Sequence, residues 1–234
     1  MRALPACLLS LTILAALGAC RPAGDTAPVP APAPEPAPAA EPAPPAVADT
    51  IVAGFRCGDL LVGATFDNAA GNVTLSINGS RRQLPQAPSA SGARYADAAD
   101  NEFWNKGDAA TLTLDGAAHE CHETADVSPW DAARARGIVF RAVGNEPGWL
   151  VEVEGGDAPL LRAQLDMGAR TVEAGPVART AEGFSGTAAD GTAIVLKASA
   201  DGCVDGMSGQ SFPASVELAV GGERFRGCGA FLDR

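Results

Sequence analysis

Between residues 51 and 124, apolar and polar residues alternate in short runs that turn residues separate. A period of two is typical of antiparallel strands with one buried face. Asn78-Gly79, Lys106-Gly107-Asp108 and Asp115-Gly116 are typical hairpin turns. We expect eight strands, at residues 52–57, 60–66, 73–78, 81–86, 93–97, 102–106, 109–114 and 117–123. So many short strands favour a small closed antiparallel barrel, because closure leaves no exposed strand edge.

Residues 125–137 follow a different local pattern. Ser128 suits a helix N-cap, Pro129 the first helical position and Gly137 the stop. We predict one short helix or helical linker there. Strand signals then resume at 138–142, 149–154, 192–198, 215–220 and 223–225. The fold class expected is therefore all-β, with a barrel domain at 51–124 and a second, mainly β domain at 138–234.

The first residues have the pattern of an export signal. Arg2 precedes an apolar run that is too short for a spanning helix and ends at Leu17-Gly18-Ala19-Cys20. These four residues look like a lipobox, so we predict a signal peptide at 1–19 and a lipidated Cys20. Plain secretion with a free thiol at Cys20 is the alternative. Arg21 follows in place of the Asp that commonly retains lipoproteins in the inner membrane, which favours anchoring in the outer membrane, facing the periplasm.

Residues 20–50 consist largely of Pro and Ala with a few acidic residues, most densely at 28–45. Such a composition cannot bury a core and favours a disordered, extended tether. At about 3.1 Å per residue, the Pro/Ala-rich residues 21–48 would span up to about 85 Å.

Six cysteines are present, of which Cys7 lies in the signal peptide and Cys20 in the lipobox. The other four lie in an exported chain, where an even number indicates two disulfides with three possible connectivities. Proximity and the domain division favour pairing Cys57 with Cys121 and Cys203 with Cys228.

The chain is acidic. Its net charge is −11, and loss of residues 1–19 removes only one charged residue, Arg2, which gives −12. An acidic surface does not suit nucleic acid, although it suits a basic protein partner. Exported proteins are often acidic for solubility alone, so charge by itself decides little. The sequence predicts no cofactor and does not indicate an oligomeric state.

A loop of small residues, Ser91-Gly92-Ala93-Arg94-Tyr95, precedes the segment Phe103-Trp104-Asn105-Lys106-Gly107, and both lie between Cys57 and Cys121. A small-residue loop can enter a narrow cleft, and a lysine beside it can offer charge to carboxylates. Most glycosidases cut with a pair of carboxylates. Taken singly, Ser91-Gly92 would be an ordinary turn and Lys106 a solvated side chain. The combination, together with the cysteine spacing, favours a binding site.

This combination resembles the membrane-bound inhibitors of c-type lysozyme. The resemblance covers residues 51–124, and it implies an eight-stranded antiparallel barrel without turnover of its own. It also implies that Ser91 and Lys106 reach the catalytic carboxylates of a c-type lysozyme, which would be the partner. Enzymes of this type are generally basic, which agrees with the acidic chain. An aromatic residue two places before the first cysteine, here Phe55, fits the family as well.

Other residues of the loop region have subsidiary expected roles. Gly92 lets the loop turn without a side chain that would strike the cleft wall. Ser89, one strand period from Ser91, is an alternative donor. Arg94 either rims the site or remains solvated. Tyr95 and Trp104 are expected to anchor the loop from below rather than to contact the enzyme.

A catalytic or metal site would have to use the two histidines, His119 and His122, which flank Cys121. Alternation along a strand places His119 and Cys121 on one face and His122 on the other, so the three residues cannot form one zinc site. A disulfide would also remove Cys121 as ligand or nucleophile. We therefore predict no metal site.

The second domain resembles an uncharacterised domain of exported bacterial lipoproteins. The resemblance rests on the segments 144–149, 203–209 and 227–229, and it implies no activity. Gly206-Met207-Ser208-Gly209 lacks the spacing of a nucleophile elbow, and no histidine follows residue 137, so we predict a turn beside a disulfide. Glu146 and Asp205 are a candidate for a glycosidase carboxylate pair, although the sequence does not show that they lie close together. The alternative to an inhibitor is an envelope structural or binding lipoprotein whose main activity lies in this domain.

Overall fold

The computed structural model describes residues 49–234. The predicted signal peptide, Cys20 and nearly all of the predicted tether lie outside the described residues. These described residues belong to one compact unit. Within this part of the chain, no helix has the length and apolar character needed to cross a membrane.

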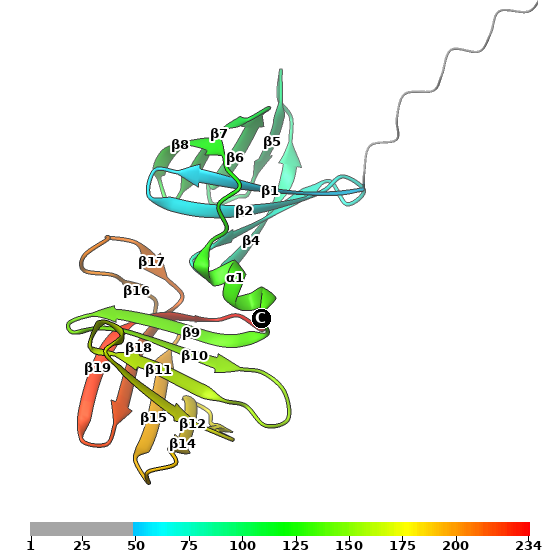
Figure 1. Ribbon diagram of the computed structural model, residues 1–234. Coiled ribbons are helices and arrows are strands. Elements are labelled where there is room, and N and C mark those ends of the chain that lie inside the picture. Colours follow the sequence, from blue (N-terminus) through cyan, green and yellow to red (C-terminus); the bar gives the residue numbers. More distant parts are fainter. Residues whose placement is uncertain (1–48) are drawn as a thin grey trace, which may run out of the picture. The chain divides into compact units, whose positions relative to one another are not determined.

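The first eight strands close into an antiparallel barrel, as the sequence predicted (Figure 1). Each strand pairs with its neighbours in the chain, and β8 returns to β1. The strands are β1 (Thr50–Cys57), β2 (Leu60–Asp67), β3 (Asn72–Ile77), β4 (Ser80–Ala87), β5 (Ala93–Ala96), β6 (Glu102–Lys106), β7 (Ala109–Leu114) and β8 (Ala117–Glu123). The last three have the predicted bounds, and the others differ from the predicted ones by one or two residues.

Alternate residues of these strands fill the barrel. Phe55 packs edge-on against Phe103 with ring centroids 5.2 Å apart, and Phe66 lies 5.7 Å from Tyr95. Val73, Leu75, Leu84 and Leu112 complete the interior and are fully buried. Apolar residues therefore alternate with polar ones in the sequence because one face of every barrel strand is buried.

A disulfide fastens the seam of the barrel. Only three residue pairs connect β1 with β8, and Cys57 opposite Cys121 is one of them. These two cysteines form the disulfide, with their Cα atoms 4.1 Å apart and both side chains buried. The covalent bond therefore reinforces a short ladder that has to hold the first and last strands together.

A short helix, α1 (Pro129–Ala135), follows the barrel. Ser128 is its N-cap, and the Ser128 hydroxyl accepts a hydrogen bond from the Trp130 amide at 3.2 Å. Pro129 occupies the first turn, and Gly137 follows the helix with a φ of +82°. The local pattern of residues 125–137 thus predicted this helix correctly.

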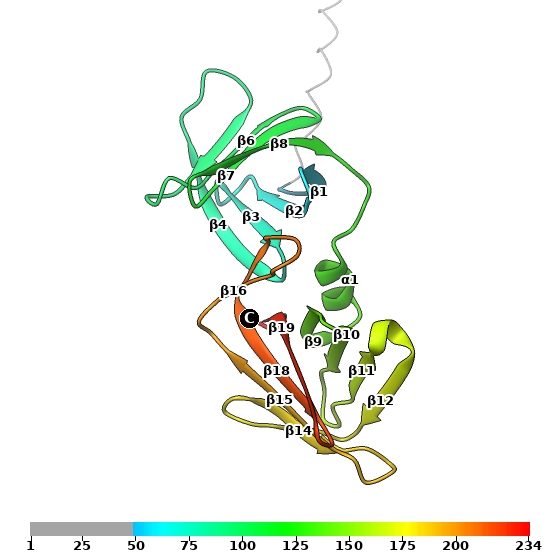
Figure 2. The same ribbon diagram turned by 90° about the vertical axis from the view of Figure 1, so that its left-hand side faces the viewer.

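A second, nine-stranded antiparallel sheet follows in the order β12-β11-β10-β9-β19-β18-β15-β14-β13, with the separate hairpin β16-β17. Figure 2 shows this sheet curled, so that its two halves enclose a common core. The strands are β9 (Ile138–Asn145), β10 (Gly148–Glu154), β11 (Leu161–Leu165), β12 (Arg170–Ala174), β13 (Ala178–Arg179), β14 (Gly183–Thr187), β15 (Ala193–Ser199), β16 (Cys203–Val204), β17 (Ser211–Phe212), β18 (Ala214–Val220) and β19 (Glu223–Phe231). A single 3₁₀ turn, η1 (Asp166–Gly168), joins β11 to β12.

The sequence did not predict six of these strands: β11, β12, β13, β14, β16 and β17. Three of them have only two residues, too few to show a period. β11 alternates clearly in the structure, although its Arg, Ala and Gln have low strand propensity. β19 runs on through Gly227 and Gly229 because the backbone of β9 lies directly beside them. Long-range pairing therefore overrides weak local preference here.

Candidate functional site

Residues 88–92 form the loop between β4 and β5, and this loop rests on the end of β6. Gly92 has a φ of +69°. A Cβ atom at this position would lie 2.3 Å from the Asn105 carbonyl oxygen and 2.8 Å from Lys106 Cγ. Any side chain there would therefore push the loop away from β6, which is a stricter reason for glycine than the turn that the sequence suggested.

The indole of Trp104 connects the loop with the lysine. Its Nε1–H donates a hydrogen bond to the Ser91 carbonyl oxygen at 2.9 Å. The ammonium group of Lys106 lies 3.6 Å from the centroid of the same ring, which is well within cation–π range. Both Ser91 and Lys106 are exposed. One half-buried aromatic side chain thus holds the two predicted donors next to each other on the barrel surface.

The charge of Lys106 is not neutralised by the protein itself. Within residues 49–234, no carboxylate lies within 4.0 Å of its Nζ atom, and no hydrogen bond of the Ser91 hydroxyl is found. A cation and a hydroxyl donor are therefore both available to an external acceptor.

Arg94 is committed to a partner of its own. Its guanidinium forms a salt bridge of 2.6 Å with Glu102, and it also donates to the Pro88 carbonyl oxygen at 3.5 Å. The structure shows that Arg94 is not simply solvated, and its place at the rim of the site stays a prediction. The salt bridge instead neutralises Arg94 and ties the loop residue Pro88 to β5 and β6.

Ser89 does not have the strand geometry that the sequence reading assumed. Residues 88–92 contain no strand, so the two-residue period does not apply between Ser89 and Ser91. The Ser89 hydroxyl donates to the Gly92 carbonyl oxygen at 3.0 Å, inside the loop. This bond stabilises the loop and occupies the proton that Ser89 would otherwise offer to a partner.

Tyr95 lies inside the barrel rather than on its surface. Only 4% of the residue is exposed, and its burial raises the pKa of the phenol. Trp104, by contrast, is half-buried and faces outward next to the loop. Trp104 thus contacts the loop directly. The predicted role of Tyr95 as an anchor under the loop stays a prediction.

Sequence analysis missed two residues that shape this site, Glu102 and Asn105. Glu102 pairs with Arg94, and the Asn105 side-chain amide donates to the Gly107 carbonyl oxygen at 2.9 Å, which shapes the turn after Lys106. Alternation along β6 places Glu102, Trp104 and Lys106 on one face, so the partner of Arg94 was partly visible in the sequence. The role of Asn105 was not, because it depends on the turn geometry.

The histidine segment has the alternation that the sequence indicated. Cys121 is buried in its disulfide and His122 is exposed, while His119 points to the same side as Cys121. Among residues 49–234, no group of three or more His, Cys, Asp or Glu side chains is arranged to hold a metal ion.

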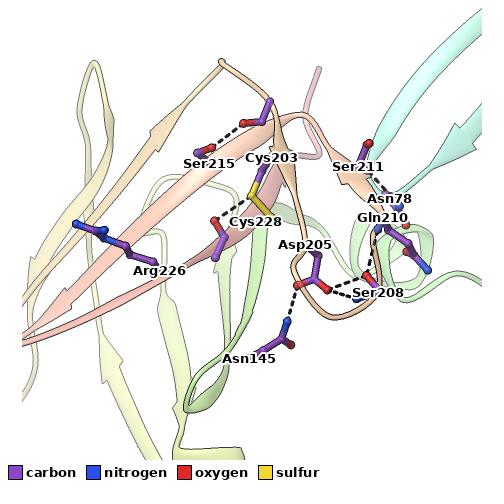
Figure 3. The surroundings of a disulfide bond; sticks show 12 residues. Asn78, Asn145, Cys203, Asp205, Ser208, Gln210, Ser211, Ser215, Arg226 and Cys228 are labelled. Carbon is purple, nitrogen blue, oxygen red and sulfur yellow. Dashed lines mark hydrogen bonds between the residues drawn. A yellow bond between two sulfur atoms is a disulfide. The ribbon is translucent and has the colours of Figure 1, made fainter. Parts of the chain in front are cut away.

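The second sheet carries an open cleft of about 1030 Å³, lined among others by Glu146, Asp205 and Glu217. Figure 3 shows the Asp205 carboxylate between Ser208 and Asn145. Ser208 donates to it through its amide at 2.7 Å and its hydroxyl at 2.8 Å, and the Asn145 amide donates at 2.5 Å. The bonds from Ser208 hold the pKa of Asp205 below its usual value. Asp205 is therefore an ionised turn residue and unsuited to the general acid of a glycosidase pair.

The Ser208 hydroxyl donates its proton to Asp205. The segment around Ser208 is a turn, as the sequence predicted. The neighbouring Cys203 forms a disulfide with Cys228, which is the pairing that the sequence favoured. Trp149 donates its Nε1–H to the Arg226 carbonyl oxygen at 3.2 Å, with Gly144 against the indole. The motif residues of this sheet thus have structural partners.

Comparison with known proteins identifies one family. Residues 55–120 match the family model described as membrane-bound lysozyme-inhibitor of c-type lysozyme. No curated protein and no solved structure gives a significant match. The family match ends within β8, so the resemblance of residues 138–234 to an exported lipoprotein domain stays a prediction. The barrel that carries the Ser91 loop and Lys106 is therefore similar to the membrane-bound inhibitors of c-type lysozyme, a family of inhibitors rather than of enzymes.

Proposed function

We propose that this protein inhibits c-type lysozyme by placing the Ser91 loop and Lys106 in the cleft of the enzyme, against its catalytic carboxylates. The observation that carries the proposal is the arrangement on Trp104, where an exposed ammonium group and an exposed serine lie on one indole without a carboxylate of this chain beside Lys106. The family match supports the same partner.

The geometry suits a plug because its donors are fixed before binding. Lys106 loses little rotamer freedom in the complex if the indole already holds its ammonium group, and the loop is tied to β6 through Ser91 and Gly92. In the cleft, the ammonium group and the serine hydroxyl donate hydrogen bonds to carboxylate oxygens. The glycosidase then lacks a free pair of carboxylates, so hydrolysis stops.

Long-range charge supports this encounter. The net charge of the exported chain, −12 after the loss of Arg2 from the full-length value of −11, attracts a basic enzyme and speeds association, while the local cation Lys106 meets the acidic centre of the cleft. The two effects act at different distances and do not oppose each other, because the attraction over long distance depends on the whole charge and the contact depends on the groups at the interface.

The direct test is an activity assay of a c-type lysozyme with increasing amounts of the exported chain. We expect stoichiometric loss of peptidoglycan hydrolysis. Undiminished lysozyme activity at a large molar excess of correctly folded, disulfide-bonded protein would contradict the proposed function.

Replacing Ser91 with Ala is expected to weaken inhibition by about 1 to 2 kcal/mol, because it removes one neutral donor from the interface. The carbonyl oxygen that accepts from Trp104 belongs to the backbone, so the loop should keep its shape. The inhibition constant of the variant measures the effect. Ser89→Ala is the matched comparison, since it removes a serine hydroxyl that bonds inside the loop. If the inhibition constants of Ser91→Ala and the unaltered protein are equal, the Ser91 hydroxyl is not part of the contact with lysozyme.

We also propose that the protein is anchored in the outer membrane through a lipidated Cys20 and faces the periplasm, where it protects peptidoglycan. Support comes from the lipobox at Leu17–Cys20 and from the membrane-bound character that the family description states. The Pro/Ala-rich residues 20–50 would then let the barrel reach a lysozyme at some distance from the membrane.

Mass spectrometry of the mature amino terminus tests the anchor. We expect a chain that begins at Cys20 and carries the additional mass of acyl groups. A Cys20→Ala variant should be neither acylated nor cleaved at this position. Cleavage elsewhere, or a Cys20 terminus without acyl mass, would show that the chain is secreted in another way.

A further inference from the structure

A groove of about 710 Å³ runs along the outside of the barrel, between its first strands and the segment that leads into α1. The strands β1, β2 and β3 form one wall, and residues 124–128 with α1 form the other. A volume of this size is typical of sites for small molecules, and the walls combine apolar side chains with polar and charged ones. None of the residues that form the Ser91 and Lys106 site lines this groove.

Small residues of the barrel let the segment that leads into α1 lie against it. Gly54 and Gly63 face each other in the register of β1 and β2. Segment 124–131 approaches both closely: a Cβ atom at Gly54 would lie 2.7 Å from the Thr124 carbonyl oxygen, and one at Gly63 would lie 3.0 Å from the Asp131 carboxylate. The apolar side chains at its rim are unusually exposed, at 74% for Val52 and 64% for Val127. These two valines offer apolar surface that no other part of the described chain covers.

A cluster of charges forms the polar end. The largely buried Arg134 bonds to the Asp131 carboxylate at 2.6 Å, to the Gly79 carbonyl oxygen at 3.0 Å and to the Ser76 hydroxyl at 3.3 Å. Ser76 in turn donates to Asp131 at 2.5 Å. Both bonds to Asp131 end on its Oδ1 atom, so Asp131 is the charged partner of Arg134.

Arg81 also lines the groove, and within residues 49–234 it has no salt bridge. Arg81 lies opposite Ser76 in the register of β3 and β4, and Ser76 bonds to Arg134, so the two positive charges lie near each other and repel. Burial and the positive charge of Arg81 accordingly lower the pKa of Arg134. The other carboxylate of the groove, Asp126, is neutralised by Arg56 at 2.5 Å. Two arginines therefore share one available carboxylate, and this end of the groove carries an uncompensated positive charge.

We propose that this groove binds a small amphiphilic anion, namely a carboxylate on an unbranched aliphatic chain. The carboxylate would pair with Arg81 and relieve its repulsion with Arg134, while the chain would lie along Val52 and Val127. An apolar ligand without charge would leave the repulsion in place, and a cation would increase it. Charge and shape thus select the same class of molecule.

The test is an NMR titration of the exported, disulfide-bonded chain with decanoate below its micelle concentration. We expect saturable shifts of the Val52 and Val127 methyl groups and of the Gly63 amide. Decyltrimethylammonium has the same chain with the opposite charge, and acetate has the charge without the chain; neither is expected to shift these signals. Equal shifts with decanoate and decyltrimethylammonium would overturn the proposal, as would the absence of saturable shifts with decanoate.

Replacing Arg81 with Gln should weaken decanoate binding about tenfold, because it removes the charged partner of the carboxylate. Arg82→Gln is the matched control. It makes the same change at the adjacent residue of β4, whose guanidinium lies instead near Asp97 at 3.7 Å and Asp115 at 3.9 Å. Its affinity should stay within about twofold of the unaltered protein. Equal weakening of decanoate binding by both variants would overturn the proposal, because the affinity would then depend on the overall charge of the protein and not on Arg81.

Two further outcomes are informative. Shifts at Val52 and Val127 that follow protein concentration rather than decanoate would assign the groove to a second copy of the chain, and would overturn the proposal. Lysozyme inhibition should be unchanged by Arg81→Gln, because Arg81 lies outside the Ser91 and Lys106 site. The experiments can therefore disprove ligand binding in the groove without affecting the proposed lysozyme inhibition, and the reverse.

Discussion

Replacing Lys106 with Ala is expected to weaken the inhibition of c-type lysozyme by about 2 to 5 kcal/mol in binding free energy. In the proposed complex the ammonium group is desolvated between Trp104 and the carboxylates of the enzyme. Its removal leaves those carboxylates buried against an uncharged surface, which costs more than the loss of a neutral hydrogen bond. Inhibition constants from titration of lysozyme activity measure the difference.

Two control variants make this result specific. Lys106→Met keeps an unbranched side chain over the indole but removes the charge, and should be nearly as weak an inhibitor as Lys106→Ala. Lys197→Ala removes a lysine from β15, where its ammonium group pairs with Glu182 at 2.9 Å, and should not alter inhibition. If the Ser91→Ala and Lys106→Ala double variant inhibits at the same concentration as the unaltered protein, the plug mechanism is wrong, even if the protein is an inhibitor.

Replacing both Cys57 and Cys121 with Ala is expected to lower the free energy of unfolding by about 4 kcal/mol. The disulfide closes a loop with a sequence separation of 64 residues, and loop-closure entropy of this size gives that value. The loss should be clearly measurable, because only three residue pairs connect β1 with β8 and the barrel is too small to bury a large core. Urea denaturation, followed by the fluorescence of the tryptophans, measures the loss.

The corresponding change at Cys203 and Cys228 is the control for this prediction. Its sequence separation is 25 residues, so the expected loss is smaller, about 3.5 kcal/mol, and should affect mainly the signals of the second sheet. Peptide mapping without reduction should first confirm both bridges in the purified chain. An unfolding free energy of the Cys57 and Cys121 variant equal to that of the unaltered protein would show that β-sheet pairing alone closes the barrel.

The sequence by itself predicted the features that depend on residues close to one another in the chain. Alternation in residues 51–124 predicted all eight barrel strands, since each strand buries one face in a common interior. Ser128, Pro129 and Gly137 predicted the helix and its ends, because caps act within a few residues. The cysteine pairs also followed from the sequence, since proximity and the division of the chain left one favoured connectivity.

The tertiary structure decided what depends on residues that are distant in the chain. Trp104 and Ser91 meet because the pairing of β5 with β6 brings the loop onto the indole. The sequence could not predict this hydrogen bond, because its acceptor is a backbone carbonyl oxygen, which every residue has. The partner of Arg94, the bond from Ser89 to Gly92 and the groove beside Arg81 are of the same kind. Strands such as β11 and β14 formed despite weak propensity because neighbouring strands supplied their hydrogen bonds. Sequence patterns thus showed which residues face the core, whereas the contacts that make a site arise only when the strands are paired.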